Sequence, residues 1–292
     1  MSHGHSDPGM RAADIRFVLI CILFANVAVV AAKFVIGLKT GSLAVLGDAM
    51  HSSVDAINNV LALVVMSVAV LGPDEEHPYG HQKFETLGTL AIVGFLSVTC
   101  FELVKGSIQR LMAGAPPLQV SSLQIAILVG TLLVNVGVAT YESSKGRQLD
   151  CEILLADAAH TKADVFITVG VLAGVLLSFS GLTWADPLVA MGVAVVILVL
   201  AWGILARSIP VLVDEHYIPA RDLRASAEAV KGVKRAYSIR SRGSRFSSFA
   251  ELTIAVDRQV SVEAAHDTAD DVESELRSRF GLSEITVHVE PC

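Results

Sequence analysis

The chain has 292 residues, of which 53% are hydrophobic, and a formal net charge of −7 at pH 7. Its mean hydropathy of +0.59 is too high for a soluble domain of this length, so we expect a protein embedded in membrane lipid. The negative net charge excludes no membrane function, but it gives no indication of a nucleic-acid partner, and we expect none. The four cysteines are scattered without a C-x-x-C pair, which argues against a disulfide framework and a zinc knuckle.

Six apolar segments follow a polar N-terminal tail, residues 1–14, in which no removable signal peptide is apparent. A transmembrane helix needs about 20 predominantly apolar residues, and each segment is long enough. We therefore expect a six-helix transmembrane domain over residues 15–213. Its helices are expected at residues 15–38, 42–71, 84–112, 121–141, 152–179 and 186–213.

Two of these helix boundaries have specific signals. The fourth helix is expected to end at Tyr141, before a polar loop of residues 142–150. The sixth opens on Asp186-Pro187, which is typical of an N-cap carboxylate followed by proline at the first helical position.

The second and fifth apolar segments contain the same pattern, D-A-x-H-x-x-x-D, at residues 48–55 and 157–164. Residues four apart share one face of a helix, so each segment offers one histidine and one aspartate on the same side. If the two helices face each other, two imidazole nitrogens and two carboxylate oxygens converge in a tetrahedral set that suits zinc. The expected ligands are His51, Asp55, His160 and Asp164.

Ionisable side chains inside a membrane are costly and by default mark an ion pathway. The alternative is that each is a polar residue satisfied within a helix bundle, and the near-duplication of an octapeptide argues against it. Asp48 and Asp157 precede the histidines by three residues, as hydrogen-bonding partners of the ligands or as relay stations. Asn58 and Asn59, one turn beyond Asp55, are expected to make interhelical hydrogen bonds.

A polar loop after the second helix offers a further cluster of metal-binding residue types. Asp74, His77 and His81 surround Pro78-Tyr79-Gly80, a sequence that bends rather than continues a helix. These side chains could form a weak, open zinc site in an exposed cytoplasmic loop. The alternative is an ordinary solvated loop.

The placement of cations predicts the orientation of the chain. Cations concentrate before the first helix, after the second and fourth, and at the end of the sixth: Arg11, Arg16, Lys83, Lys145, Arg147 and Arg207. The opposite connections carry few, among them Lys39 and Arg110. We therefore expect a multi-pass protein of the cell inner membrane with both termini in the cytoplasm.

Residues 214–292 have the composition of a soluble domain. The pattern predicts helices at 219–230 and 261–280 and strands at 233–242, 246–256 and 284–290, an αββαβ order with helices on one face of a sheet. A domain this small is marginal alone, so we expect it to dimerise.

The C-terminal domain contains a third candidate zinc site. His288 and Glu290 are two apart on a predicted strand and so point to one face. His266 on the preceding helix could meet them there, and Cys292 could add a thiolate, although we expect a frayed terminus. The alternative is that all are ordinary surface residues.

Together these motifs resemble the cation diffusion facilitator family of zinc and other divalent-metal/proton antiporters. The resemblance covers almost the whole chain: six spans, HxxxD in the second and fifth, the loop D-x-x-H-P-Y-G-H-x-K-x-E, Asp186-Pro187 and a cytoplasmic αββαβ domain. It implies a homodimer that binds metal between the second and fifth spans at the two HxxxD pairs, with a second site in the loop. It also implies a charge interlock between Lys83 and Asp214 near the dimer contact.

The resemblance also bears on metal choice. Histidine and aspartate in both helices resemble the zinc-selective branch, whereas branches for manganese, iron or cadmium more often have a carboxylate or amide where His51 stands. One departure lies in the cytoplasmic domain, where Tyr237 and Thr253 occupy positions that match two histidines of a binuclear site in bacterial zinc members. Metal-driven closure of the soluble dimer is then weaker, or uses one ion per subunit.

We therefore expect a homodimeric exporter that moves Zn2+ out of the cytoplasm against inward proton flow, with Zn2+ also a candidate regulatory ion, and not an enzyme. An intramembrane metalloprotease is disfavoured, because no HExxH occurs and each expected ligand is matched by its duplicate, which leaves no open coordination position or general base. A metal-binding sensor or scaffold without transport is the remaining alternative.

Overall fold

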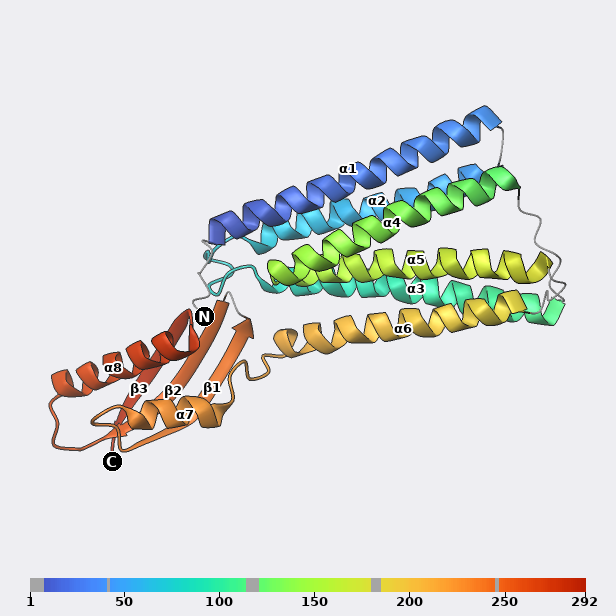
Figure 1. The fold of residues 1–292 in the computed structure, drawn as a ribbon. Coiled ribbons are helices and arrows are strands. Elements are labelled where there is room, and N and C mark those ends of the chain that lie inside the picture. Colours follow the sequence, from blue (N-terminus) through green and yellow to red (C-terminus); the bar gives the residue numbers. More distant parts are fainter. Residues whose placement is uncertain (1–7, 41–42, 114–120, 180–184, 245–246) are drawn as a thin grey trace. The chain divides into compact units, whose positions relative to one another are not determined.

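The computed structural model describes residues 8–40, 43–113, 121–179, 185–244 and 247–292 (Figure 1). The chain forms two compact units, Met1–Ser208 and Ile209–Cys292.

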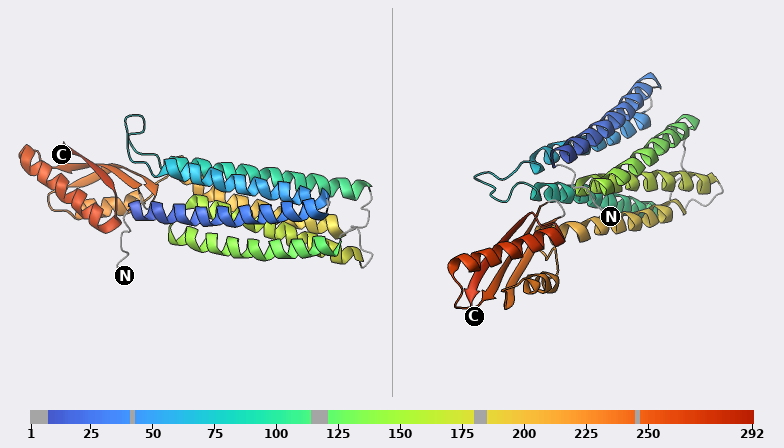
Figure 2. Two further views of the ribbon diagram at one scale, coloured as in Figure 1. Left: turned by 90° about the horizontal axis from the view of Figure 1, so that it is seen from above. Right: turned by 60° about the vertical axis from the view of Figure 1, so that its left-hand side comes forward.

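The first unit is a bundle of long helices that run lengthwise beside one another (Figure 2). This confirms the expected six-helix membrane domain. The helices are α1 (Pro8–Thr40), α2 (Leu43–Ala69), α3 (Lys83–Ala113), α4 (Ser122–Gln148), α5 (Glu152–Phe179) and α6 (Ala185–Leu212).

The six helices differ in how apolar they are. Within the described residues, α1, α3, α4 and α6 are long and apolar enough to cross a membrane by length and composition. In α2 the described apolar stretch is Asp55–Ala69, and the first half of α5 carries several charged side chains. α5 contacts α2, α3 and α4, so its charged side chains can face protein rather than lipid.

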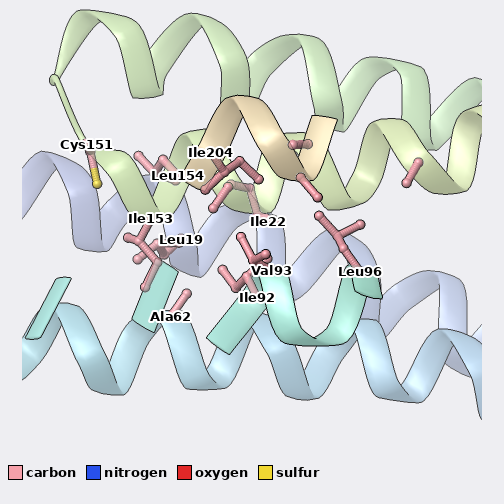
Figure 3. Close-up of a cluster of buried hydrophobic side chains, with 14 of the residues drawn as sticks. Leu19, Ile22, Ala62, Ile92, Val93, Leu96, Cys151, Ile153, Leu154 and Ile204 are labelled. Atoms are coloured by element: carbon pink, nitrogen blue, oxygen red, sulfur yellow. The ribbon is translucent and has the colours of Figure 1, made fainter. Parts of the chain in front are cut away.

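The bundle core is built from large aliphatic side chains. Figure 3 shows them meeting from several helices: Leu19, Ile22, Ala62, Ile92, Val93, Leu96, Ile153, Leu154 and Ile204. Gly88 allows a close approach of α3, because a Cβ there would lie 2.7 Å from Val65 of α2 and 2.9 Å from Ile153 of α5. Gly146 of α4 likewise faces Leu155 of α5, 2.9 Å from where its Cβ would be.

The predicted end of the fourth helix is wrong. α4 does not stop at Tyr141 but continues to Gln148, and Glu142, Ser143 and Gly146 are buried. The polar residues expected in an aqueous loop continue the helix because α5 packs against them. The N-terminus of α4 follows from the local sequence, because Ser121 and Gln124 form a capping box there.

α1 reaches into the segment expected to be a polar tail, since its described part starts at Pro8. The described part of α6 starts at Ala185 and has Asp186 in its first turn. Arg110 of α3 donates a 2.6 Å hydrogen bond to the Asp186 carboxylate.

A hydrogen bond links the first turn of α3 to the start of α5. Glu85, in the first turn of α3, accepts a 2.6 Å hydrogen bond from the backbone N–H of Glu152, the first residue of α5. The first N–H groups of a helix have no partner within the helix, so α3 supplies an acceptor that α5 lacks.

The second unit is a small α/β domain, as expected. Its elements are α7 (Ala220–Ala229), β1 (Arg235–Ser244), β2 (Ser247–Val256), α8 (Val262–Phe280) and β3 (Glu284–Pro291). The sheet order is β1-β2-β3, with β1 and β2 antiparallel and β2 and β3 parallel. The parallel pair needs a crossover, which α8 provides.

Both helices of this unit cover one face of the sheet (Figure 1). Ile285, Val287 and Val289 of β3 join Val272 and Leu276 of α8 in one hydrophobic cluster. Since side chains alternate along a strand, the residues between them point to the opposite, open face.

Candidate metal centre

The membrane unit brings together three of the four expected ligands. Asp55 comes from α2, and His160 and Asp164 come from consecutive turns of α5. His160 Nε2 lies 3.2 Å from an Asp55 oxygen and 3.9 Å from an Asp164 oxygen. One ligand atom from each of the three lies within 4.8 Å of the other two.

These spacings fit a tetrahedral divalent ion. Zinc binds nitrogen and oxygen at about 2.0–2.1 Å, which places tetrahedral ligand atoms roughly 3.3–3.4 Å apart. The two observed separations bracket that value. The fourth expected ligand, His51, belongs to α2 one turn before Asp55, but its side chain lies outside the described residues, as does that of Asp48.

The histidine of this cluster is enclosed by protein. His160 is buried, and Asp55 and Asp164 are half-buried. Asn58 of α2 places its amide nitrogen 3.4 Å from His160 Nε2. His160 Nδ1 has no hydrogen-bond partner among the described residues, and the described contacts with Asp55, Asn58 and Asp164 are all made at Nε2.

A chain of buried amides and a carboxylate lies one helical turn from the cluster. Asn59 donates a 2.7 Å hydrogen bond to Asp157 and accepts one from Asn26 of α1. The expected interhelical role of Asn58 and Asn59 is confirmed. Asp157 is thereby fixed at the ligand-bearing face of α5, and α1, α2 and α5 are linked through one network.

Two buried charged residues escaped the sequence analysis. Lys33 of α1 donates a 2.8 Å hydrogen bond to Ser52 of α2, and Glu142 of α4 faces Thr161 of α5. A signal was present for Lys33, since a lone lysine interrupts the first apolar run. The sequence contained no such signal for Glu142, because the polar residues 142–150 were expected to form a loop.

The loop between α2 and α3 brings its three expected ligands together. Asp74 lies 3.5 Å from His77 Nδ1 and 3.4 Å from His81 Nε2, and the three form a second cluster. Gly80 has φ +85°, a conformation that favours glycine, and it turns the chain so that His81 returns towards Asp74.

The loop geometry also keeps its carboxylate ionised. The backbone N–H of His77 donates a 2.6 Å hydrogen bond to Asp74, and that of Glu76 donates a second. These bonds, with the neighbouring His81 and His77 rings, lower the pKa of Asp74. An ionised carboxylate beside two imidazoles is a suitable divalent-cation ligand set.

The C-terminal unit brings together two of its three expected ligands. His288 Nε2 lies 3.5 Å from a Glu290 oxygen on the open face of the sheet. His266 instead pairs with Asp270 on α8 at 3.8 Å. Because α8 covers the other face of the sheet, His266 does not join His288 and Glu290 within one chain. Cys292 is exposed at the end of the chain.

The open face also carries the two residues that stand where histidines were expected from the family resemblance. Tyr237 pairs with Thr253, and Thr253 with His288, in one row across the three strands. The Tyr237 hydroxyl donates a hydrogen bond to Glu290, which raises the pKa of Tyr237. Asp214, expected in an interlock with Lys83, lies 3.6 Å from Arg242. The interlock itself stays a prediction.

Comparison with known families decides the assignment. Residues 19–213 match the family described as "Cation efflux transmembrane domain", and residues 219–292 match "Cation efflux protein, cytoplasmic domain". The chain belongs to the cation efflux family, also called the cation diffusion facilitator family. The recognition made from the sequence motifs is therefore confirmed.

Individual relatives span nearly the whole chain of this cation efflux protein. Cation-efflux pump FieF of Cronobacter sakazakii is 30% identical over 256 residues, 87% of this chain and 85% of the relative. Manganese efflux system protein MneP of Bacillus subtilis is 26% identical, covering 94% of this chain and 96% of the relative. A solved MamM-CTD structure matches 25% of this chain and 91% of its own length at 25% identity, with a TM-score of 0.24.

Proposed function

We propose that this cation efflux protein exports Zn2+ from the cytoplasm in exchange for protons. The observation that carries the proposal is the convergence of His160, Asp55 and Asp164 from two helices inside the membrane unit. With His51 they would form two nitrogens and two oxygens around the ion. A site enclosed by α2 and α5 can be opened to either side by movement of the helices around it.

The choice of zinc rests on the ligand chemistry. Family membership does not identify the transported metal, because the relatives include one named for manganese efflux. Imidazole suits Zn2+, whereas carboxylate and water suit Mn2+. His51→Asp should therefore weaken discrimination against manganese and cadmium, measured by competition with zinc uptake. An unchanged competition profile would assign selectivity to something other than ligand identity.

Proton exchange follows from the same ligands. Metal binding requires neutral imidazole and ionised carboxylate, so ions and protons compete for the site. When the site faces a more acidic exterior, protonation would release Zn2+. When the protonated site turns inward, loss of protons to the cytoplasm would prepare it for the next ion.

The remaining clusters fit regulation rather than passage. Asp74, His77 and His81 would bind Zn2+ outside the bundle, and His288 with Glu290 would bind it on the open face of the C-terminal sheet. We propose a homodimer in the inner membrane with both termini in the cytoplasm, so that both clusters sense the cytoplasmic ion.

The decisive experiment uses the full-length protein in sealed proteoliposomes. Zinc flux and internal pH are recorded together, with and without an imposed pH gradient. Zinc movement accelerated by a gradient that is acidic on the release side, with protons moving in the opposite direction, supports antiport. Zinc binding without flux would indicate a sensor, and flux indifferent to the gradient would leave a uniporter.

A further inference from the structure

The membrane unit encloses a carboxyl group that the proposed transport cycle does not use. Glu142 of α4 is 0% exposed. Its Oε2 lies 3.1 Å from the hydroxyl of Thr161, the residue after His160 on α5. Its Oε1 has no hydrogen-bond partner among the described residues. A carboxyl group in such a position is costly unless it serves a purpose.

The hydrogen-bond geometry around Thr161 indicates which form of the acid fits. The Thr161 hydroxyl also lies 3.1 Å from the backbone carbonyl of Asp157. A hydroxyl carries one proton, and the carbonyl can only accept. Both contacts are satisfied at once when Thr161 donates to the carbonyl and a protonated Glu142 donates to the Thr161 oxygen.

The charged surroundings of Glu142 come from α5. Asp157 and Asp164 are near enough to act on it with the same charge, and Lys162 acts on it with the opposite charge. α1 also packs against α4, and the charged groups that act on Glu142 among the described residues belong to α5. The acid therefore responds to the charge at one helix, and Asp164 on that helix belongs to the proposed metal site.

A divalent ion beside Asp164 changes this balance. Without the ion, the carboxylates of α5 disfavour a further negative charge nearby. With the ion bound, its two positive charges offset theirs, and an ionised Glu142 becomes less costly. Arrival of the ion therefore favours loss of the proton, and departure of the ion favours its return.

We propose that Glu142 is a proton-binding site of the antiport cycle, separate from the metal ligands, which holds one of the protons exchanged for each ion. The inference rests on the proposed proton exchange. In the releasing step the O–H bond of the acid breaks, the electron pair stays on the carboxylate and the proton passes to water. Glu142 lies six residues before the end of α4 at Gln148, about 9 Å along the helix, so the path to that end of the bundle is short.

The test compares Glu142→Gln with the wild-type protein. Glutamine keeps the shape, and its side-chain amide N–H can donate to the Thr161 oxygen as the protonated acid does, but it cannot release a proton. Protons released on zinc binding are counted with a pH indicator in weakly buffered detergent solution. We expect the variant to release about one proton fewer per subunit than the wild type, because one acid is gone.

A second measurement separates coupling from passage. In proteoliposomes, zinc–zinc exchange at equal pH on both sides needs no net proton movement, and we expect it within about twofold of wild type, since the metal ligands are intact. Acceleration by a pH gradient should be lost. Glu102→Gln, at an exposed position on α3, is the matched control and should keep both the proton count and the gradient response.

The outcomes are distinct. An unchanged proton count and gradient response in Glu142→Gln would overturn the role of Glu142 while leaving zinc/proton exchange standing. A wild type that releases no protons would overturn the proposed exchange itself. If Glu142→Gln does not accumulate, Glu142→Asp retains an acid at a changed distance from Thr161. Glu142→Asp should then release as many protons on zinc binding as the wild type, but over a different pH range. Proton release over the same pH range as the wild type would contradict the proposal.

Discussion

Two groups that each combine a histidine with a carboxylate lie in very different surroundings. In the membrane unit, Asp55 and His160 are 105 residues apart in sequence and meet inside a helix bundle. In the C-terminal unit, His288 and Glu290 are two residues apart on one strand and are 68% and 48% exposed. The first pair exists only because α2 and α5 fold together, whereas the second needs only the alternation of a strand.

The difference decides what each group needs. Water reaches the exposed pair, and Glu290 already accepts a hydrogen bond from the Tyr237 hydroxyl. The polar atoms of His288 and Glu290 therefore have hydrogen-bond partners without a metal ion. The enclosed group holds two half-buried carboxylates around one buried imidazole, so a cation or protons are needed to balance its charge. In the proposed cycle the enclosed group therefore exchanges ions and protons, whereas the exposed pair only binds the ion that it senses.

The largest expected effect comes from removing an enclosed ligand. Replacing any one ligand by alanine should reduce zinc transport by about 100-fold, because removing one partner from a buried charged group costs about 3 kcal/mol or more. The four variants are Asp55→Ala, His160→Ala, Asp164→Ala and His51→Ala. Zinc flux in proteoliposomes checks this at matched protein abundance. His266→Ala, on the exposed face of α8, is the control, and wild-type flux in any two ligand variants would refute the site.

A smaller effect is expected one helical turn away. Asn59→Ala removes the hydrogen bond to Asp157 and the link to Asn26, without touching a ligand. Partners that orient a metal site typically change affinity by about 10-fold, and we expect a loss of that order in zinc affinity by isothermal titration. Ser67→Ala, also on α2 and exposed, is the control. Equal affinity of the two variants would mean that the ligands are rigid without the network.

The exposed pair should bind zinc more weakly. We expect residues 209–292, a compact unit, to dimerise and to take up zinc at His288 and Glu290, with a thermal stabilisation that grows with zinc concentration by mass action. His288→Ala should abolish the thermal stabilisation by zinc. His266→Ala should leave it unchanged if the site is formed by one chain. A loss in both variants would show that α8 contributes from a partner chain.

The smallest effect is a spectroscopic one. The hydrogen bond to Glu290 raises the pKa of Tyr237, so its contribution to stability is present below the ordinary tyrosine pKa and is lost as the pH rises through the raised value. In residues 209–292 the tyrosines are Tyr217 and Tyr237. Glu290→Gln, or saturating zinc, should lower the pH at which one of them ionises in an ultraviolet titration. If neither Glu290→Gln nor zinc changes the pH of tyrosine ionisation, Glu290 does not accept a hydrogen bond from Tyr237 in solution.

The ligand positions could be predicted because they depend on local geometry. Spacings of four on a helix and two on a strand fix which side chains share a face, and the duplicated octapeptide indicated that α2 and α5 meet. The bend at Gly80 likewise follows from local sequence. For the same reason most boundaries of the apolar helices were predictable to within a few residues, the start of α1 and the end of α4 excepted.

Other features depend on what packs against them. Glu142 was assigned to a loop because hydropathy measures affinity for lipid, whereas this residue is buried against another helix. His266 was expected beside His288 because sequence does not show which face of the sheet α8 covers. Lys33 meets Ser52 only through the packing of α1 on α2. Each error concerns contact between elements, which no local pattern contains.

The hydrogen bond from Glu152 to Glu85 also has a consequence for biosynthesis. The first half of α5 carries Asp157, Lys162 and Asp164, and its first turn takes an acceptor from α3. A nascent α5 therefore enters the bilayer at little cost only where α3 already lies. Because α3 is made first, the order of synthesis supplies the partner. Glu85→Ala should accordingly delay membrane integration of a chain truncated after α5, while a chain truncated after α4 should integrate normally.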